Sequence, residues 1–344
     1  MKIILDVMGG DNPASEFVKG AVLAHDRFIA ENCDAEIILC GNERVIREAL
    51  QRLRRSADMF AIVHAEDYVT MEDDPMSIVQ IHKDSSMSRA LKYVSDGKAD
   101  ACVSAGNTGA LFTGATLIER RIRGVRRAAL AMVLPYECPV LALDCGANVS
   151  VTVEYLVQFA YLGSVYMEKV MGVEKPRIGL LNNGAEAHKG TALYVETNKM
   201  LREASDLNFI GNVEAKDVQF NKCDVLVTDG FTGNIMLKSC EGISKFIMDK
   251  INNELFGGIG GKLSSLIRRS EVAKILKTFD VTEYGGAPFL GLAKPVIKAH
   301  GNSDANAVMN AVMQAVKYVD TGVIEYIGAC ADKFPKIVVN DKEK

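Results

Sequence analysis

Four glycine-rich loops carry the side chains of this sequence that are best suited to handle an anion. Each loop follows a short apolar run and mixes glycine with Asn, Asp, Thr or Lys. Glycine lets backbone N–H groups come close to a ligand, and the N-terminus of a following helix favours negative charge. Ordinary turn chemistry is the alternative, because any turn between a strand and a helix tolerates glycine. We expect one anion-binding cleft formed by residues 6–11, 104–110, 182–190 and 229–234.

The elements that must position these loops alternate along the chain. Short, continuous apolar runs, typical of strands buried on both faces, alternate with longer amphipathic segments. This rhythm predicts an α/β fold: a doubly wound, three-layer α/β/α architecture with a mostly parallel sheet. Ligands of such folds bind beyond the carboxyl ends of the strands, where the loops lie. The expected strands are residues 3–7, 36–40, 60–64, 101–104, 128–134, 140–144, 177–181, 209–213, 225–228 and 295–299. The expected helices are residues 13–31, 43–55, 77–95, 108–120, 153–171, 191–204, 232–252, 262–278 and 303–319.

The chain contains no internal repeat and no linker rich in Pro, Gly or Ser. We therefore expect a single α/β catalytic unit over residues 1–335, with a helical excursion at about 232–280. Residues 336–344 are largely charged, and we expect them to form a frayed C-terminal tail.

Composition excludes several classes of protein. The 344 residues are 48% hydrophobic and 24% charged, which is typical of globular chains and excludes disordered and fibrous classes. The formal charge of −4 disfavours nucleic-acid binding, because generic binders are basic. The eight cysteines include no C-x-x-C pair, so we expect small buried hydrophobes in a reducing compartment. The N-terminus has no signal-peptide pattern and no uncharged apolar run could span a bilayer, so we expect a cytoplasmic protein.

The sequence lacks several motifs that would indicate a particular cofactor, metal or catalytic mechanism. No loop reads as G-x-G-x-x-G or as a Walker A loop, so nothing supports a nucleotide. The sequence also lacks H-E-x-x-H, G-x-S-x-G and an EF-hand loop. We expect no cofactor and no metal site. The five histidines are dispersed, and only His188 lies within a glycine-rich loop.

Eight short motifs carry a resemblance to a known family. They are Met8-Gly-Gly-Asp11, Asp84-Ser-Ser-Met87, Ser104-Ala-Gly-Asn-Thr-Gly-Ala110, Asp144-Cys-Gly-Ala-Asn148, Gly211-Asn-Val-Glu-Ala215, Asp229-Gly-Phe-Thr-Gly-Asn234, Tyr284-Gly-Gly-Ala287 and Pro295-Val-Ile-Lys-Ala-His-Gly301. In this order and spacing they resemble the phosphate acyltransferases of bacterial phospholipid synthesis, the PlsX family. The resemblance runs along nearly the whole chain.

The resemblance implies an activity, a fold and an assembly. The family moves a fatty acyl group from acyl-acyl-carrier protein to inorganic phosphate, giving acyl phosphate and free carrier protein. It resembles phosphotransacetylases and isocitrate/isopropylmalate dehydrogenases in fold, works as a homodimer and associates peripherally with membrane. The first loop departs from the family pattern, since Asn12-Pro13-Ala14 replaces a His-Ala-Pro-like tripeptide. Gln80 stands where the family often has arginine, and His82 and Lys83 are the nearby substitutes for that anion contact.

The implied reaction needs no nucleophilic side chain and no metal. Phosphate is already an anionic oxygen nucleophile near neutral pH, and a thiolate is a good leaving group. We therefore expect direct attack of phosphate on the thioester, without a covalent enzyme intermediate. Positioning contributes roughly 7–11 kcal/mol in favourable cases, and one oxyanion donor contributes roughly 2.7–4 kcal/mol.

Lys189 is the first candidate for the catalytic group. A lysine between a glycine-rich turn and a helix start can neutralise phosphate or the tetrahedral oxyanion; the alternative is a solvated surface lysine. Asn234 is an amide donor suited to the oxyanion, or a helix cap. His188 is the candidate to protonate the leaving thiolate. The candidate substrate-binding residues are Gly9, Gly10, Asp11, Lys83, Ser85, Ser86, Gly106, Asn107, Thr108, Gly109, Asn148, Glu186, Asp229, Lys298 and His300.

Two further segments are candidate interaction surfaces. Acyl carrier protein is strongly acidic, so the basic stretch Arg120, Arg121, Arg123, Arg126 and Arg127 suits its docking, or is a solvated loop. Residues 255–279 join a glycine-broken apolar loop to a basic helix. This pattern fits an interfacial amphipathic helix, and it also fits a core or dimer-interface helix. Its candidate membrane contacts are Leu263, Leu266 and Ile267.

Three other functions remain as alternatives. A dehydrogenase of the related fold needs a metal-carboxylate cluster and a dinucleotide site, and neither stands out in the sequence. A phosphotransacetylase that uses acyl-coenzyme A is closer in chemistry. A non-catalytic scaffold for carrier protein or lipid would not explain four polar, glycine-rich loops on one sheet edge.

Overall fold

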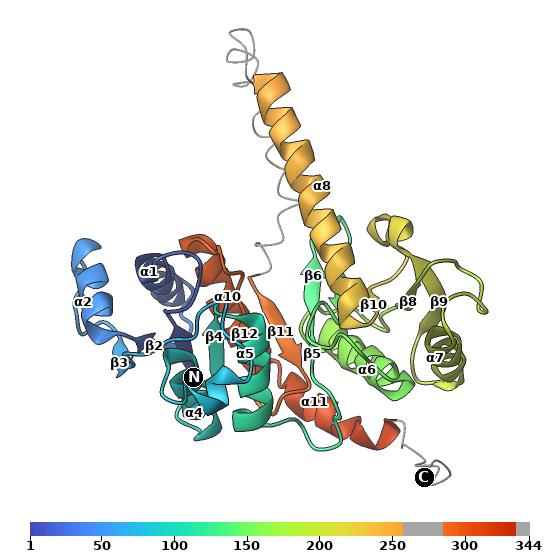
Figure 1. Cartoon of the computed structure of the whole chain (residues 1–344), viewed down its shortest axis with the longest axis horizontal. Helices are drawn as coiled ribbons and strands as arrows, with labels where there is room; N and C mark the ends of the chain where they lie inside the picture. The colour runs from blue at the N-terminus through green and yellow to red at the C-terminus, as the bar shows by residue number, and fades with distance from the viewer. Residues whose placement is uncertain (257–284, 335–344) are drawn as a thin grey trace.

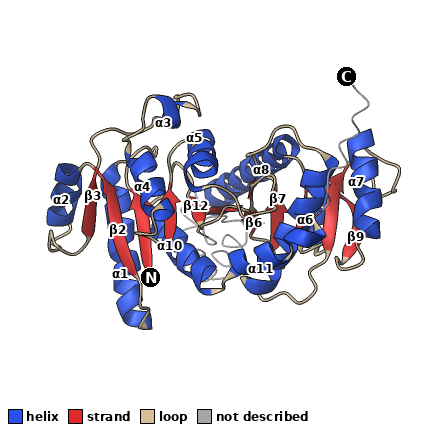
Figure 2. Cartoon of the chain, turned by 90° about the horizontal axis from the view of Figure 1, so that it is seen from below, coloured by secondary structure: helices blue, strands red, loops and turns tan. Residues whose placement is uncertain are grey.

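The strands and helices of the protein alternate along the chain and form two mixed sheets, each covered by helices. The computed structural model describes residues 1–256 and 285–334. Figures 1 and 2 show the two sheets side by side, with helices on their faces. The predicted α/β class is confirmed, and the strands are divided between two sheets.

The first sheet contains seven strands in the order β3-β2-β1-β4-β12-β11-β5. The five strands from β3 to β12 are parallel, and β11 runs antiparallel to both of its neighbours. Alternate side chains of β1 enter different cores. Ile3 and Leu5 lie in one core with α1 (Ala14–Glu31) and α10 (Ala305–Asp320), and Ile4 lies in another with α4 (Ser86–Ser95) and α5 (Thr108–Gly114). The strands are β1 (Lys2–Asp6), β2 (Glu36–Gly41), β3 (Ala61–His64), β4 (Ala101–Ser104), β5 (Ala129–Leu130), β11 (Ala287–Leu290) and β12 (Val296–Lys298).

The helices around this sheet follow the predicted amphipathic segments, with one break. They are α1 (Ala14–Glu31), α2 (Glu43–Arg52), α3 (Ser77–Gln80), α4 (Ser86–Ser95), α5 (Thr108–Gly114), its π-helical continuation η1 (Ala115–Glu119) and α10 (Ala305–Asp320). The single helix expected over 77–95 is wrong. Ser85 accepts a hydrogen bond from the backbone N–H of Ser88 and so caps a new helix, α4.

The second sheet contains five strands in the order β6-β7-β10-β8-β9, and only β6 is antiparallel to its neighbour. Helices α6, α7 and α11 pack in the core on one face, and Leu237 of α8 packs in the core on the other. The strands are β6 (Met132–Leu134), β7 (Val140–Leu143), β8 (Ile178–Asn182), β9 (Phe209–Glu214) and β10 (Val225–Val227). The helices are α6 (Val153–Lys169), α7 (Ala192–Glu203), the 3-10 helix η2 (Ala215–Phe220), α8 (Gly230–Phe256), α11 (Val323–Ala329) and the short η4 (Ala331–Lys333).

The strand expected over 128–134 is divided at Ala131, and this division joins the two sheets. Its first part, β5, runs toward the carboxyl-terminal edge of the first sheet. Its second part, β6, starts at the carboxyl-terminal edge of the second sheet, because Met132 pairs with Ala142 late in β7. The two edges that carry the glycine-rich loops therefore adjoin at Ala131.

Asp144, which directly follows β7, stabilises this junction with hydrogen bonds to a strand of the first sheet and to a loop of the second. Its fully buried carboxylate accepts hydrogen bonds of 2.6–3.2 Å from five N–H groups. One belongs to Leu130 in the first sheet, and the others belong to residues 146–148. Burial raises the pKa of Asp144, and these donors oppose that rise by favouring the charged form.

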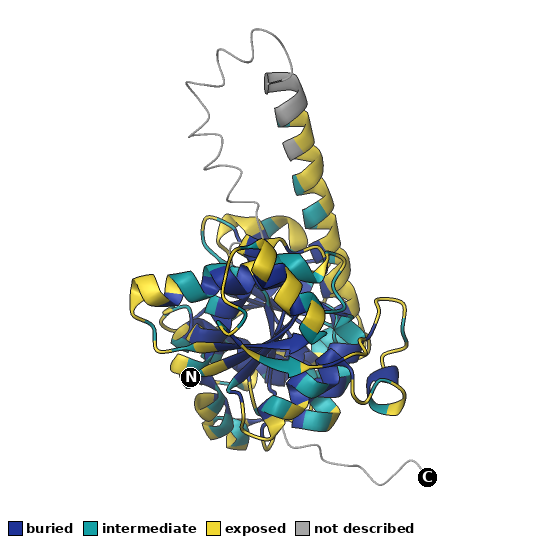
Figure 3. Ribbon diagram, turned by 90° about the vertical axis from the view of Figure 1, so that its left-hand side faces the viewer, coloured by how far each residue is buried: buried dark blue, intermediate teal, exposed yellow. Residues whose placement is uncertain are grey.

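Helix α8 begins against the Asp144 loop and then extends away from both sheets (Figure 1). A Cβ atom on Gly233 would lie 2.0 Å from the carbonyl oxygen of Asp144, so only glycine permits this approach. Most of the described length of α8 is exposed (Figure 3). No helix among the described residues is long and apolar enough to cross a membrane. The candidate membrane residues Leu263, Leu266 and Ile267, the rest of the expected excursion and the tail lie outside the described ranges.

A pair of glycine substitutions in α8 tests the close approach of this helix. Gly233→Ala should lower the free energy of unfolding by about 1–3 kcal/mol, because the backbone must shift. Gly242→Ala, in open space on the same helix, should raise it by about 0.8–1 kcal/mol through helix propensity. Urea denaturation measures both changes, and equal effects of the two variants would contradict the described packing.

Candidate active site

A cavity of about 370 Å³ lies between the carboxyl-terminal edges of the two sheets. The first sheet contributes residues that follow β1, β4 and β12, and the second contributes the loop after β7. The first turns of α8 close the cavity. Its polar or charged lining residues are Asp11, Thr108, Asn234, Lys238, Glu241, Lys298 and His300.

Lys298, the last residue of β12, places a buried ammonium group in this cavity. Its side chain donates hydrogen bonds to the carbonyl oxygens of Ala105 (3.2 Å) and Ala299. Burial lowers the pKa of Lys298 to about 8, and Lys238 adds to the effect while Asp11 opposes it. An anion bound beside Lys298 would relieve this unfavourable burial of charge.

His300 and Asn234 supply neutral donors to the same cavity. The Nδ1 atom of His300 accepts a hydrogen bond from the backbone N–H of Asn302 (3.4 Å), which leaves Nε2 to carry the proton. Burial and the charge of Lys238 lower the pKa of His300. The side chain of Asn234 faces Gly146, and its amide has no hydrogen-bond partner within residues 1–256 and 285–334. Lys298, His300 and Asn234 can therefore bind and stabilise an anion.

A second, larger cavity of about 1160 Å³ lies along the opposite face of α8, and we call it the α8 groove. Its polar end is formed by the loop after β8, by Tyr194 of α7 and by Thr232 of α8. Tyr194 donates a hydrogen bond to Asp229, whose carboxylate also accepts the N–H and hydroxyl of Thr232 (both 2.8 Å). Asp229 is thus the cap of α8.

Lys189, His188 and Glu186 lie in the loop at the polar end of the α8 groove, not in the cavity between the sheets. All three are exposed. The loop is fixed through its backbone: Asn182 donates to the carbonyl of Lys189 (3.0 Å), and the N–H of Lys189 donates to the carbonyl of Glu186 (3.0 Å). The predicted single anion cleft is therefore wrong. Two loops reach the cavity between the sheets, the Lys189 loop lies at the α8 groove, and the first turn of α8 borders both.

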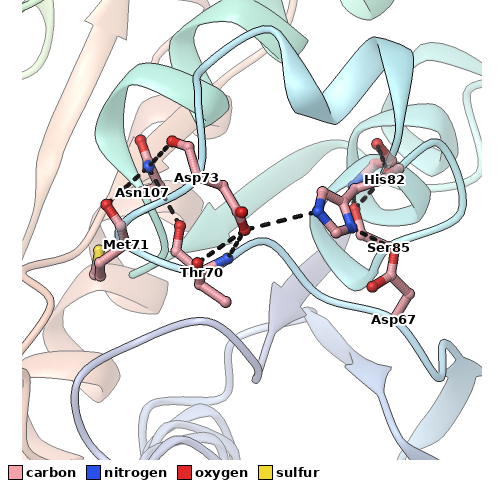
Figure 4. A network of polar contacts seen from close by, with 8 residues as sticks. Asp67, Thr70, Met71, Asp73, His82, Ser85 and Asn107 are labelled. Carbon is pink, nitrogen blue, oxygen red and sulfur yellow. Dashed lines mark hydrogen bonds and ion pairs between the residues drawn. The ribbon is translucent and has the colours of Figure 1, made fainter.

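Asn107 is a structural residue rather than a free donor to phosphate. Its amide donates to the carbonyls of Thr70 (3.3 Å), Met71 (3.2 Å) and Asp73 (3.0 Å), and its oxygen caps α5. His82 belongs to the same network (Figure 4), because its ring lies 2.8 Å from Asp67 and 3.7 Å from Asp73. Neither Asn107 nor His82 has a side chain free for substrate.

Several other predicted substrate contacts in the first-sheet loops and around Asp144 are buried, tightly packed or outside both cavities. Ser85 and Ser86 are buried, and the Ser85 hydroxyl donates to the carbonyl of His82 (2.8 Å). Asn148 is buried and donates to Asp144 (2.7 Å) and to the carbonyl of Ala128 (2.8 Å). Lys83 is exposed and lines neither cavity. The glycines of the first-sheet loops serve close packing, because a Cβ would clash at Gly9, Gly10, Gly106 and Gly109.

The arginine-rich stretch lies at the opposite edge of the first sheet. It precedes β5, and β5 starts at the amino-terminal edge of the parallel strands. Arg120 accepts a backbone hydrogen bond from Ala293, in the turn between β11 and β12 at that edge. A carrier protein docked on this stretch would face away from both cavities.

Tyr194, Lys238 and Glu241 are polar residues of the two cavities that the sequence did not point to. Lys238 and Glu241 form an ion pair of 2.7 Å on α8, and Tyr194 holds the cap of that helix. All three are helical residues outside the glycine-rich motifs. Only the packing of α7 and α8 around the two cavities, known once both helices are placed, relates them to the site.

Solved structures of other proteins share this fold. A phosphotransacetylase from Streptococcus pyogenes matches with a TM-score of 0.61 at 17% identity, covering 93% of this chain and 94% of that one. A branched-chain phosphotransacylase from Enterococcus faecalis matches with a TM-score of 0.56 at 14% identity, covering 93% and 99%. A 4-hydroxythreonine-4-phosphate dehydrogenase from Klebsiella pneumoniae matches with a TM-score of 0.52 at 13% identity, covering 92% and 98%. The predicted similarity to phosphotransacetylase and dehydrogenase folds is confirmed.

Proteins found by sequence comparison are much more similar to this chain than these solved structures are. The family model described as "Fatty acid synthesis protein" matches residues 1–326. A phosphate acyltransferase from Thermoanaerobacter pseudethanolicus is 43% identical over 328 residues, covering 95% of this chain and 96% of the relative. A phosphate acyltransferase from Clostridium perfringens is 40% identical over 345 residues, covering 100% of both chains. The chain therefore belongs to this family of phosphate acyltransferases, the PlsX family, and is an acyltransferase.

Proposed function

We propose that the protein transfers a fatty acyl group from acyl-acyl-carrier protein to inorganic phosphate, giving acyl phosphate for phospholipid synthesis. The observation that carries the proposal is the buried ammonium of Lys298, in a cavity between the loop-bearing edges of the two sheets. A buried cation is costly, and an anionic substrate bound beside it offsets that cost. Inorganic phosphate is the anion that family membership favours.

The proposed reaction is a direct displacement. A phosphate oxygen attacks the thioester carbon, the new C–O bond forms, and the C–S bond breaks through a tetrahedral oxyanion. The thiolate leaves with the electron pair and takes up a proton. Cys145, a thiol that lines the cavity, is buried, and burial raises its pKa, so it is a poor nucleophile at neutral pH. The proposal therefore includes no acyl-enzyme intermediate.

The roles divide between the two sides of the first turn of α8. Lys298, His300 and Thr108 bind phosphate, and Asn234 donates to the oxyanion. Lys189 and His188, at the α8 groove, act on the thioester side, where Lys189 stabilises charge and His188 protonates the leaving thiolate. One such donor lowers the activation free energy by roughly 2.7–4 kcal/mol.

The remaining parts of the proposal depend on the family resemblance and on sequence patterns. They are a homodimer, docking of the acidic carrier protein on a basic face, and peripheral contact with membrane through Leu263, Leu266 and Ile267. Lys189 and Lys216 at the α8 groove are a basic docking face nearer to the chemistry than the arginine-rich stretch.

A second candidate function is acyl transfer from acyl-coenzyme A, which the fold similarity to phosphotransacetylases favours. A thiol-release assay distinguishes the two functions. We expect phosphate-dependent release of thiol from acyl-acyl-carrier protein, with a kcat/KM at least tenfold higher than with the matching acyl-coenzyme A. Faster release from acyl-coenzyme A would support the second function, and no phosphate-dependent release from either donor would contradict both.

Lys298 should make kcat/KM for phosphate dependent on pH. Its ammonium is charged below its pKa of about 8 and neutral above it. The attraction for phosphate is therefore present below pH 8 and lost as pH rises through that value, so kcat/KM for phosphate should fall by about tenfold per pH unit above it. Lys298→Met should lower kcat/KM for phosphate at least tenfold at pH 7, about 1.4 kcal/mol, and remove the inflection. Lys317→Met, at an exposed position on α10, is the control; an unchanged profile in Lys298→Met would contradict the assignment.

Lys189→Ala should leave the fold intact, because the side chain is exposed, and should lower kcat by tenfold or more, about 1.4 kcal/mol. Lys199→Ala, at an exposed position of α7 that lines neither cavity, is the matched control for loss of a positive charge. Steady-state kinetics and thermal melting of the purified variants measure the two effects. If kcat of Lys189→Ala equals that of the native protein, Lys189 is not catalytic.

A further inference from the structure

We propose that the α8 groove binds the acyl chain of the thioester substrate. This inference rests on the proposed function, since it assigns the site for one half of that substrate. No described residue lines both the groove and the phosphate cavity, so the assignment of the groove and the assignment of the phosphate site can fail separately.

The groove has the length and shape of a site for a linear chain. Its α8 wall is formed by side chains three to four residues apart, which places them on one face of the helix. The wall runs from Thr232 to Ser244, and twelve residues at 1.5 Å each give about 18 Å. Ser239, in the middle of the wall, has a small side chain.

The chemistry of the groove changes along this length. The end near the sheet is polar, with the loop after β8, Tyr194 and Thr232. The stretch beyond it presents Ile235, Met236 and Ile243. Ile235 and Ile243 are 52% and 60% exposed, an arrangement that costs free energy in water unless a ligand covers them. An acyl thioester has the same polarity, with one polar end and a long apolar tail.

The opposite wall is also partly apolar. It contains Leu181 at the end of β8 and Tyr136, which follows β6. The hydroxyl of Tyr136 lies 3.7 Å from the Sγ atom of Cys240, so the opposite wall contacts α8 at this residue. This contact makes the groove a hollow between two elements rather than a flat face.

The polar end of the groove lies where the thioester must be. Thr232 lines the groove and Asn234, two residues later, lines the phosphate cavity. An acyl chain bound along α8, with its carbonyl group at this turn, places the thioester carbon at the boundary between the groove and the phosphate cavity. Phosphate then reaches that carbon from the opposite side of the turn. Lys189 and Lys216, at or near the groove, match the negative charge of an acidic carrier protein that holds the sulfur end.

Bulky substitutions within the groove test the assignment. Ser239→Trp and Ile243→Trp fill it, and Phe246→Trp, an exposed position on α8 that does not line it, is the matched control. The readout is the ratio of kcat/KM for palmitoyl-carrier protein to that for butyryl-carrier protein in phosphate-dependent thiol release. We expect the two groove variants to lower this ratio at least tenfold and the control to leave it unchanged. An unchanged ratio in the groove variants would overturn the proposal.

A binding measurement keeps the test independent of turnover. We expect the native protein and Phe246→Trp to bind palmitate in isothermal titration calorimetry, and Ser239→Trp to bind it at least tenfold more weakly. If the native protein releases no thiol but binds palmitate in this pattern, the proposed function fails and the groove assignment holds. Groove variants that change the oligomeric state in sedimentation, with palmitate binding unchanged, would assign the groove to a second copy of the chain and overturn the proposal.

Discussion

The carboxylate of Asp144 accepts hydrogen bonds from five N–H groups in a site from which water is excluded. One donor is Leu130 of β5, and the rest belong to the loop on which α8 begins. Without this acceptor, several buried N–H groups would lose their partner, at about 1–3 kcal/mol each. This one side chain links the first sheet to the loop of the second sheet against which α8 begins.

The first turn of α8 then separates two kinds of chemistry. Charged and hydrogen-bonding groups gather on the side of Asn234 and Lys298, and apolar side chains extend along the side of Ile235 and Ile243. A reaction between a small anion and a long acyl thioester needs this separation, because one reactant is best held by buried charge and the other by apolar surface. In the proposed reaction, the enzyme contributes chiefly by bringing the two reactants together at this boundary.

Sequence patterns predict the alternation of strands and helices well, because continuous apolar runs and amphipathic segments have distinct periods. They cannot say to which sheet a strand belongs. β5 and β6 lie within one apolar run of the sequence, yet they pair in different sheets. The glycine-rich motifs are real structural signals, yet polar residues within them, such as Asn107 and Asn148, turn out to hold the loops rather than a ligand. The role that we propose for Lys298 depends on its burial, which results from contacts between residues far apart in the chain.

The placement of phosphate between the two sheets is the central claim, and a crystal structure of the protein with inorganic phosphate tests it most directly. The account predicts an ordered phosphate in the cavity between the sheets, within about 2.7–3.2 Å of the Nζ atom of Lys298 and of the Nε2 atom of His300. An ordered phosphate beside Lys189 at the α8 groove, with none beside Lys298, would contradict it.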